Sequence, residues 1–386
     1  MQKFVYEYAT KVYFGEGAVK EHLAEAVSAY GANVMLAYGG GSVKKNGIYD
    51  EVKSILEGAG KKVTDFSGNM SNPTYAKVQE GAKLAESEHI DFILAVGGGS
   101  VIDCCKIVTA QARTDKDLWE MEMTEHKFPT DVLPMGAIVT ASGTGAEMNG
   151  GAVITNEEKV VKAGMAAAAP RFAILDPACT MSVPRMQVIS GAFDTLSHAM
   201  ETYFGSSDED NVSDDVALAV MRNTVVNMKR LMGNIDDIQA RGNLMWDSAM
   251  AENGILKVGR VTDFQCHQME HQLGAYTDCG HGQGMAVLHP AYYRHIFRDG
   301  LDKFGRFAAN VWMIPREKKS REELAAAGLD ALEAFIRELG LPTSLRQLGV
   351  RDKKQLPVIA GSCHFSPGGY RKMMPEEILE ILQECF

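Results

Sequence analysis

A carboxylate and three imidazoles in the second half of the chain have the types and spacing of a metal-binding set. Asp194 and His198 are four residues apart in a segment without a helix breaker, so one helical turn would place both side chains on the same face. His267, in His267-Gln-Met-Glu-His271, and His281, before a glycine, follow. Imidazole nitrogens and a carboxylate oxygen suit Zn²⁺ or Fe²⁺ and leave room for an exchangeable ligand. The set predicts a catalytic metal centre.

Spacing alone leaves two alternatives open. An Asp and a His at positions i and i+4 are common as an ordinary side-chain pair on a helix surface. His267 and His271 share that spacing, so they could form a chelating pair by themselves. The fourth ligand is therefore not determined by spacing.

Three turns rich in glycine in the first half each follow a predicted buried strand. Glycine lets the backbone come close to phosphate oxygens, and the N–H groups at the start of the next helix donate to them. One such turn would more often be structural, but three at the carboxyl ends of strands in one sheet predict a bound dinucleotide. The turns are Gly39-Gly-Gly-Ser42, Gly97-Gly-Gly-Ser100-Val-Ile-Asp103 and Thr140-Ala-Ser-Gly-Thr-Gly-Ala-Glu147.

The first turn predicts NADP rather than NAD. A site selective for NAD usually places an acidic side chain near the ribose hydroxyls, where it repels a 2′-phosphate. Here the strand ends in the small residues Gly39, Gly40 and Ser42, and Lys44 and Lys45 follow. The alternative is that the two lysines only solvate the start of a helix.

Strands and helices alternate in the first half of the chain, and only helices are predicted after Pro184. Alternation of this kind is typical of βαβ units with a mostly parallel sheet. We therefore expect an α/β dinucleotide-binding domain over residues 1–184 and an all-helical metal-binding and substrate domain over residues 185–386, joined across a cleft. The expected strands are 33–38, 92–96, 135–139 and 172–175, and the expected helices are 48–56, 101–112, 186–204, 212–232, 238–256 and 322–339.

Composition narrows the class of protein. A chain of 386 residues is long for a single core, and 46% hydrophobic with 23% charged residues is ordinary for a globular protein. A net charge of −11 without long basic runs argues against nucleic acid and acidic membrane surfaces as partners. Seven cysteines without a Cys-x-x-Cys pair favour a reducing, cytoplasmic setting. No apolar stretch approaches 18 residues, so no membrane span is expected.

Two short strands are expected at the N-terminus, Phe4-Val-Tyr-Glu-Tyr8 and Val12-Tyr-Phe14. They could cap the chain's own sheet. They could equally pair with a neighbouring subunit by edge addition, and on this basis a homodimer through the N-terminal edge strands is expected.

Taken together, these motifs resemble those of the iron-containing (group III) alcohol dehydrogenases over nearly the whole chain. The resemblance is greatest to the branch of NADP-dependent butanol dehydrogenases and aldehyde reductases. It implies a Rossmann-like N-terminal domain with a mostly parallel sheet, an all-α C-terminal domain and a metal in the cleft. The motifs that carry it are Gly97-Gly-Gly-Ser-Val-Ile-Asp103, Thr140-Ala-Ser-Gly-Thr-Gly-Ala-Glu147, Asp194-Thr-Leu-Ser-His198, His267-Gln-Met-Glu-His271-Gln-Leu-Gly and His281-Gly-Gln-Gly.

The resemblance also implies roles for single residues. Many members carry an acidic residue where this chain has Gly39, and those prefer NAD. His271 would lie unligated beside the reacting centre and relay a proton. The implied metal ligands are Asp194, His198, His267 and His281; the implied phosphate contacts are Gly98, Gly99, Ser100 and Asp103; the implied nicotinamide-side contacts are Thr140, Thr144, Asn149 and Lys162; and the implied adenosine pocket includes Asn72 and Thr74.

The expected reaction is reversible hydride transfer between NADP(H) and a primary alcohol or its aldehyde, with Fe²⁺ or Zn²⁺ as a Lewis acid. A short to medium aliphatic substrate is expected, because the helical half has no cationic cluster for a phosphate or carboxylate. Alternatives are an NAD-linked polyol dehydrogenase of the glycerol or lactaldehyde/propanediol type and a sugar-phosphate cyclase, which would need basic residues that we do not find. A non-catalytic assembly subunit should have lost a ligand or a glycine turn, and none is missing.

Overall fold

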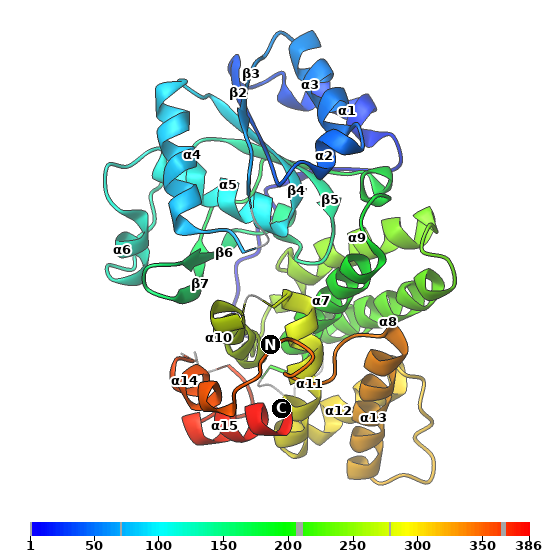
Figure 1. Cartoon of the computed structure of the whole chain (residues 1–386). Helices are drawn as coiled ribbons and strands as arrows, with labels where there is room; N and C mark the ends of the chain where they lie inside the picture. Colours follow the sequence, from blue (N-terminus) through cyan, green and yellow to red (C-terminus); the bar gives the residue numbers. More distant parts are fainter. Residues whose placement is uncertain (1, 70–71, 206–210, 278, 364–367) are drawn as a thin grey trace. The chain divides into compact units, whose positions relative to one another are not determined.

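The structure is a computed structural model that describes residues 2–69, 72–205, 211–277, 279–363 and 368–386. The chain divides into two compact units (Figure 1). One unit is Glu7–Pro184, and the other is Arg185–Phe386 together with the N-terminal residues up to Tyr6. The unit that begins at Glu7 is called the sheet unit below, and the other is called the helical unit.

The sheet unit is built on a six-stranded sheet in the order β1-β8-β5-β4-β2-β3. Every pair of neighbours in it is parallel, which confirms the predicted mostly parallel α/β architecture. The strands are β1 (Lys11–Phe14), β2 (Asn33–Tyr38), β3 (Lys62–Phe66), β4 (Phe92–Gly98), β5 (Met135–Ala141) and β8 (Phe172–Leu175).

Helices bury both faces of this sheet, which is why its central strands are continuous apolar runs. In β2, Val34 and Leu36 point to the face that packs against Leu23 of α1 (Ala18–Val27) and Val52 of α3 (Ile48–Gly58). On the other face α5 (Gly99–Gln111) contacts β4 and β5, and α4 (Tyr75–Ser87) packs beside α5. The strands and the loops that follow them are therefore fixed by a closed apolar core.

The sheet unit also contains an antiparallel hairpin that the sequence did not predict, formed by β6 (Gly151–Asn156) and β7 (Val161–Ala166). β7 is rich in glycine and alanine, and the β-branched run in β6 is only Val153-Ile154-Thr155, so the strand signal in this segment is short. The remaining elements of this unit are short, namely α2 (Ser42–Lys45), α6 (Leu118–Met123), η1 (Ala146–Met148) and η2 (Pro177–Thr180).

The described part of the helical unit contains helices and turns and no strand, as predicted. Capping boxes at Asn211 and Ser320 start two of the long helices, and Gly340 ends the second in the left-handed conformation. The helices are α7 (Arg185–Tyr203), α8 (Val212–Gly233), α9 (Ile238–Glu252), α10 (Gln265–Thr277), α11 (His281–Ile296), α12 (Leu301–Asn310), α13 (Arg321–Leu339), α14 (Leu356–Gly361) and α15 (Pro375–Glu384), with 3₁₀ turns η3 (Ile255–Lys257), η4 (Phe297–Gly300) and η5 (Lys353–Gln355).

The prediction of two N-terminal strands is half correct. Lys11–Phe14 is β1, the edge strand beside β8, but Phe4 to Tyr8 forms no strand in this single chain. A strand forms by pairing its N–H and C=O groups with a neighbouring strand, and no strand of the described chain pairs with this segment. Its side chains stay exposed, with Val5 98% exposed and Phe4 53%. Among the described helices, none is both long and apolar enough to cross a lipid bilayer.

Candidate metal centre and nucleotide-binding loops

Three helices of the helical unit bring Asp194, His198, His267 and His281 together. Asp194 and His198 lie one turn apart on α7, His267 is on the first turn of α10, and His281 is the first residue of α11. One potential ligand atom from each of the four lies within 4.8 Å of the others. Oδ1 of Asp194 is 3.2 Å from Nε2 of His281, 3.7 Å from Nδ1 of His198 and 3.9 Å from Nε2 of His267. Two ligands of a tetrahedral ion are about 3.3 Å apart, so these separations are close to those of a metal site.

Two of the potential ligand nitrogens lack hydrogen-bond partners among the described residues, as expected at a site that binds a cation. Nδ1 of His198 and Nε2 of His267 are buried and have no hydrogen-bond partner in the described part of the structure. Burying a polar atom without a partner is costly, and a bound cation would satisfy both nitrogens. The residues present therefore fit a divalent ion.

Two buried carboxyl groups stand behind the imidazoles and fix their orientation. Nδ1 of His267 is hydrogen-bonded to Glu201, one turn beyond His198 on α7. Nδ1 of His281 is hydrogen-bonded to Glu270 of α10. In each ring this leaves Nε2 to face Asp194. Histidine ligands of metals commonly have such carboxylate partners, which set the tautomer and raise the basicity of the ligand nitrogen.

Burial and neighbouring charge together set the protonation of the group. Burial lowers the pKa of His267 to about 3 and raises the pKa of Glu201 to about 8, so burial disfavours a charge on either group. Although burial opposes a charge on His281, Glu270 and Asp194 raise its pKa to about 10. Burial works against the charge of Asp194 too, yet the neighbouring His281 and His198 keep its pKa well below the usual range. A cation is thus already favoured between these carboxylates, and metal binding would displace the proton of His281.

Close helix packing positions the start of α11. A Cβ added to Gly282 would lie 2.1 Å from the backbone oxygen of Ser190 on α7. A Cβ added to Gly284 would lie 2.7 Å from Cγ of Glu270 on α10. The glycines of the His281-Gly-Gln-Gly motif therefore let α11 approach α7 and α10 closely enough for His281 to reach Asp194.

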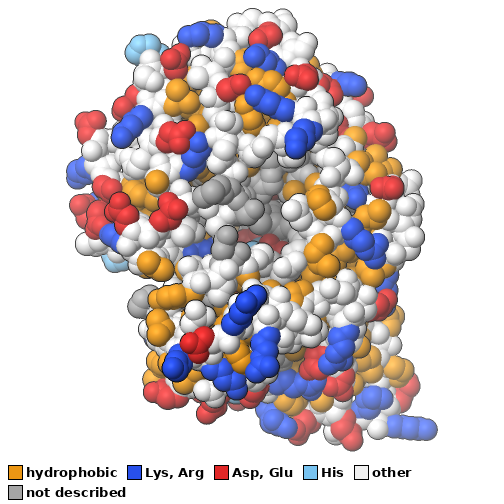
Figure 2. All heavy atoms as spheres, in the orientation of Figure 1, with side chains coloured by type: hydrophobic (Ala, Val, Ile, Leu, Met, Phe, Trp, Pro, Cys, Tyr) orange, Lys and Arg blue, Asp and Glu red, His pale blue; other side chains and the backbone are white. Residues whose placement is uncertain are grey.

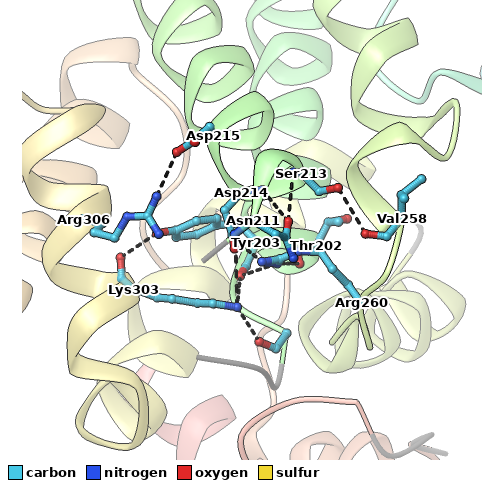
Figure 3. Close-up of polar contacts among 11 residues, drawn as sticks. Thr202, Tyr203, Asn211, Ser213, Asp214, Asp215, Val258, Arg260, Lys303 and Arg306 are labelled. Carbon is cyan, nitrogen blue, oxygen red and sulfur yellow. Dashed lines mark hydrogen bonds and ion pairs between the residues drawn. The ribbon is translucent and has the colours of Figure 1, made fainter. Parts of the chain in front are cut away.

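The far end of α7 is fixed by two buried cations (Figure 3). Arg260 donates to the backbone oxygen of Tyr203 at 3.0 Å and forms an ion pair with Asp214. Lys303 donates to the backbone oxygens of Tyr203 and Gly205 at 3.1 and 3.0 Å. Cations at the last carbonyls of a helix satisfy acceptors that have no partner within the helix and oppose the negative end of its dipole. The helix that carries two predicted ligands is therefore held at its C-terminal end.

His271 is close to the four-residue group but is not a member of it. It lies one turn after His267 on α10, is 6% exposed, and its ring centroid is 6.3 Å from that of His267 and 5.7 Å from that of His281. His271 belongs to a second possible group with Glu270 and His281. The roles of ligand and of proton relay thus remain predictions, and metal analysis separates them.

In the sheet unit, the three glycine turns gather at one edge of the sheet. They follow β2, β4 and β5, which are neighbours in the order β5-β4-β2, so their carboxyl ends lie side by side. Dinucleotides bind at such an edge in open α/β sheets. A Cβ on Gly97 would lie 2.5 Å from Cγ2 of Val101, and one on Gly99 would lie 2.2 Å from Oγ1 of Thr144. Both glycines are therefore required for packing between the turn and its neighbours.

The predicted cofactor residues occupy this edge and the hairpin beside it, and several also have structural contacts. Asp103 accepts from the backbone N–H of Val153 at 2.9 Å, and Thr74 caps α4 by accepting from Lys77 at 3.2 Å. Gly39 and Gly40 are in the turn after β2 and Ser42 begins α2; Asn72 and Thr74 precede α4; Gly98 ends β4; Gly99, Ser100 and Asp103 are on α5; Thr140 is on β5; Thr144 and Asn149 flank η1; and Lys162 is on β7. Their contact with a cofactor stays a prediction.

The turn after β2 bears on the choice of nucleotide. The ammonium of Lys44 lies 4.9 Å and 4.3 Å from the ring centroids of Tyr38 and Tyr49 and 3.6 Å from Oδ2 of Asp65. Lys44 is thus engaged by an acidic and aromatic cluster of the protein itself, so it is a weaker argument for a 2′-phosphate than the sequence indicated. Gly39 has no side chain, so no carboxylate at this position would repel a 2′-phosphate.

The sequence did not identify Glu201, Glu270 or Phe264 as residues of the metal centre. The helical spacing of Glu201 from His198 was a usable signal, because residues three apart share a face. Glu270 lies inside a motif that was read only for its histidines. Phe264, whose ring centroid is 5.1 Å from that of His267, precedes α10 and had no signal.

Two models of one protein family match the chain. Residues 9–177 match the family model of iron-containing alcohol dehydrogenases, and residues 188–386 match the C-terminal model of the same family. The chain is 37% identical to NADH-dependent butanol dehydrogenase A of Clostridium acetobutylicum over 100% of both sequences. It is 32% identical to the NADPH-dependent aldehyde reductase YqhD of Escherichia coli, covering 93% of this chain and 92% of that protein.

The chain is also similar to a solved structure. The crystal structure of NADH-dependent butanol dehydrogenase A from Thermotoga maritima superimposes with a TM-score of 0.94 and 33% identity. The match covers 100% of this chain and 99% of that one.

Proposed function

We propose a specific activity for this chain, which belongs to the iron-containing alcohol dehydrogenase family and is an alcohol/aldehyde oxidoreductase. In this proposal it is a metal-dependent, NADP(H)-linked aldehyde reductase and alcohol dehydrogenase for short to medium aliphatic substrates. The observation that carries the proposal is the cluster of one carboxylate and three imidazoles in which two buried nitrogens lack partners. The relatives named as butanol dehydrogenases and as an aldehyde reductase support an aliphatic substrate.

In this proposal Asp194, His198, His267 and His281 hold a divalent ion, Fe²⁺ or Zn²⁺. When bound, the ion supplies Lewis acidity toward a carbonyl or hydroxyl oxygen, and the nicotinamide supplies or accepts the hydride. Glu201 holds the ring of His267, and Glu270 holds the ring of His281, each through Nδ1. These contacts direct Nε2 of both rings at the ion. The glycine turns of the sheet unit bind the phosphates through backbone N–H groups.

His271 is assigned to proton transfer. Reduction of an aldehyde adds a hydride to carbon and a proton to oxygen, so the proton needs a donor near the reacting oxygen. An imidazole titrates near working pH and can pass a proton between that oxygen and solvent. The placement of His271 beside two predicted ligands, outside the four-residue group, supports this role.

The preference for NADP rests on Gly39. The names of the relatives divide between NADH and NADPH, so they do not select one nucleotide. A Cβ at Gly39 would lie 3.3 Å from the backbone oxygen of Asn69, a contact that a small shift relieves. Gly39 places no acidic side chain at this position, which is compatible with a 2′-phosphate.

We expect a panel of aldehydes and of alcohols, including 1,2- and 1,3-propanediol, to give the highest kcat/KM with aliphatic aldehydes and NADPH on metal-loaded protein. Gly39→Asp should lower the ratio of kcat/KM with NADPH to that with NADH by at least ~10-fold, because like charges oppose each other near the ribose. Steady-state kinetics with both nucleotides measure the ratio.

Gly39→Asn is the matched control, since it adds the same volume without the charge. It should shift the ratio far less than Gly39→Asp. Equal kcat/KM for the two nucleotides in the unmodified protein would contradict the NADP assignment. Activity confined to polyols with NAD would favour the polyol dehydrogenase alternative instead.

We also propose that the protein forms a homodimer through its N-terminal residues and takes no nucleic acid or membrane as a partner. β1 is an edge strand, and the segment before it exposes Phe4, Val5 and Tyr6. An edge strand and a set of exposed apolar side chains are each typical of a pairing surface. Acidic and basic side chains both occur across the face in Figure 2, which suits neither a polyanion nor an acidic lipid surface.

Val5→Glu is expected to weaken the dimer on the order of 10²-fold, because an unpaired charge would enter the contact. Light scattering across a dilution series measures the dissociation constant. Val226→Glu, at an exposed apolar position on α8, is the control and should leave the dimer intact. A Val5→Glu protein with the dissociation constant of the parent would rule out this surface.

A further inference from the structure

Phe264 has a backbone conformation that aromatic residues rarely adopt. Its φ is +96°, a region that favours glycine, so a phenylalanine there is strained. Such strain persists only where the surroundings impose it, and it concentrates at active sites and ligand clamps. Phe264 immediately precedes α10, the helix of His267.

The two neighbours of Phe264 impose this conformation. The backbone N–H of Asp263 donates to the backbone oxygen of Glu201 at 3.3 Å, and the Asp263 carboxyl accepts from the hydroxyl of Tyr292. The side chain of Gln265 donates to the backbone oxygen of Arg371 at 2.9 Å and accepts from the N–H of Met373 at 2.8 Å. Both neighbours are buried in this network, which leaves Phe264 the only side chain of the three to point elsewhere.

The ring of Phe264 lies against the metal centre. Its centroid is 5.1 Å from that of His267 and 6.2 Å from that of His198. The residue is only partly buried. The strained backbone thus places an apolar surface next to the atoms predicted to hold the ion.

The charges beside the ring are already neutralised. The ammonium of Lys257 lies 4.9 Å from the ring centroid and 2.8 Å from Oε2 of Glu252. Glu252 is itself 9% exposed. This ion pair neutralises the ammonium beside the ring, so Lys257 is not a free cation for a substrate carboxylate or phosphate.

We propose that Phe264 is a specificity-determining residue, whose ring contacts the carbon chain of an uncharged aldehyde at the metal centre. This inference rests on the proposed function and deepens it by assigning the contact that selects for chain length. Each methylene that leaves water for an apolar contact strengthens binding about fourfold. The rise in kcat/KM from acetaldehyde to hexanal should therefore come in large part from the ring.

Phe264→Gly removes the ring and relieves the backbone strain, so it tests the contact without adding a conformational cost. We expect kcat/KM for hexanal to fall roughly tenfold more than that for acetaldehyde, with metal content equal to that of the parent. The dissociation constant of 1-hexanol, measured by calorimetry on metal-loaded protein without nucleotide, should rise by a similar factor, and that of ethanol should not. Phe264→Leu keeps an apolar side chain and should retain most of the discrimination.

Met313→Gly is the matched control, because Met313 is another non-glycine residue at positive φ (57°) and is 70% exposed. It should leave the dependence on chain length unchanged. A Phe264→Gly protein that keeps the parent's dependence, loses activity equally on acetaldehyde and hexanal, or purifies without metal would overturn the inference. A parent protein inactive on every uncharged aldehyde would instead overturn the proposed function.

Discussion

Replacing His267 with alanine is expected to abolish turnover while the protein stays folded. The change removes one of the four predicted ligands and leaves Glu201 without its imidazole partner. The Lewis acidity of a bound ion is worth several kcal/mol of transition-state stabilisation, so kcat should fall by at least ~10³-fold. The purified variant should also contain much less metal than the parent.

Three measurements check this result: metal content by elemental analysis, kcat with an aliphatic aldehyde, and the circular dichroism spectrum. His295→Ala is the control, since His295 is also an imidazole of the helical unit but pairs with Glu384 at 3.1 Å and lies outside the metal-binding groups found in the described residues. It should retain metal and activity. Near-normal turnover of metal-free His267→Ala protein would show that the centre is not catalytic.

His271→Ala is expected to lower kcat roughly 10²–10⁴-fold, the usual range of a general acid–base contribution. Metal content should remain that of the parent, because Asp194, His198, His267 and His281 are all intact. The pH dependence of kcat should lose the limb that reports the titrating imidazole. This combination of full metal with low kcat is the signature of proton transfer without ligation.

The metal content of the same purified His271→Ala protein also tests the alternative role of His271 as a metal ligand. A His271→Ala protein that purifies without metal would make His271 a ligand, in a centre with Glu270 and His281. A variant with full metal and full activity would make it a bystander. His271→Gln, which keeps a hydrogen-bonding side chain but cannot titrate in this range, should behave as His271→Ala does.

The buried strands were predictable because each is a continuous apolar run. β2 and β8 begin and end at the predicted residues, and β4 and β5 begin where predicted and extend two residues further. The edge strand β3, Lys-Val-Thr-Asp-Phe, was missed because charged residues interrupt it. A sheet edge tolerates such residues, so periodicity carries little information there. The prediction of a strand from Phe4 to Tyr8 was wrong for the opposite reason. The sequence is strand-like, but a strand forms only when another strand pairs with it.

The residues around the metal centre were harder to predict from the sequence than the buried strands. α10 has the sequence Gln-Cys-His-Gln-Met-Glu-His-Gln-Leu-Gly-Ala-Tyr-Thr, and its buried face includes His267, Glu270 and His271. A search for an apolar stripe therefore misses it. The polar face is stable because its members find partners, such as Glu201 on α7 and His281 on α11. Those pairings join different helices, so spacing along one helix cannot reveal them.

The choice between His271 and His281 as a metal ligand shows what the family resemblance added to the argument from spacing. Spacing left His271 and His281 as equal candidates beside His267. The resemblance favoured His281, and the structure places it 3.2 Å from Asp194 while His271 stays outside that group. The resemblance itself is confirmed by the family matches across both halves of the chain. The ligand roles still await the metal analysis above.

The glycines at the start of α11 have a consequence for how this fold can diverge. Gly282 and Gly284 are required because the backbone of Ser190 and the side chain of Glu270 occupy the space that a Cβ would need, whether or not an ion binds. Selection for a folded chain alone would therefore retain both glycines. Selection for chemistry would retain His281, whose side chain is not needed for that close approach. A descendant that became a purely architectural subunit would keep the two glycines and let the histidine drift.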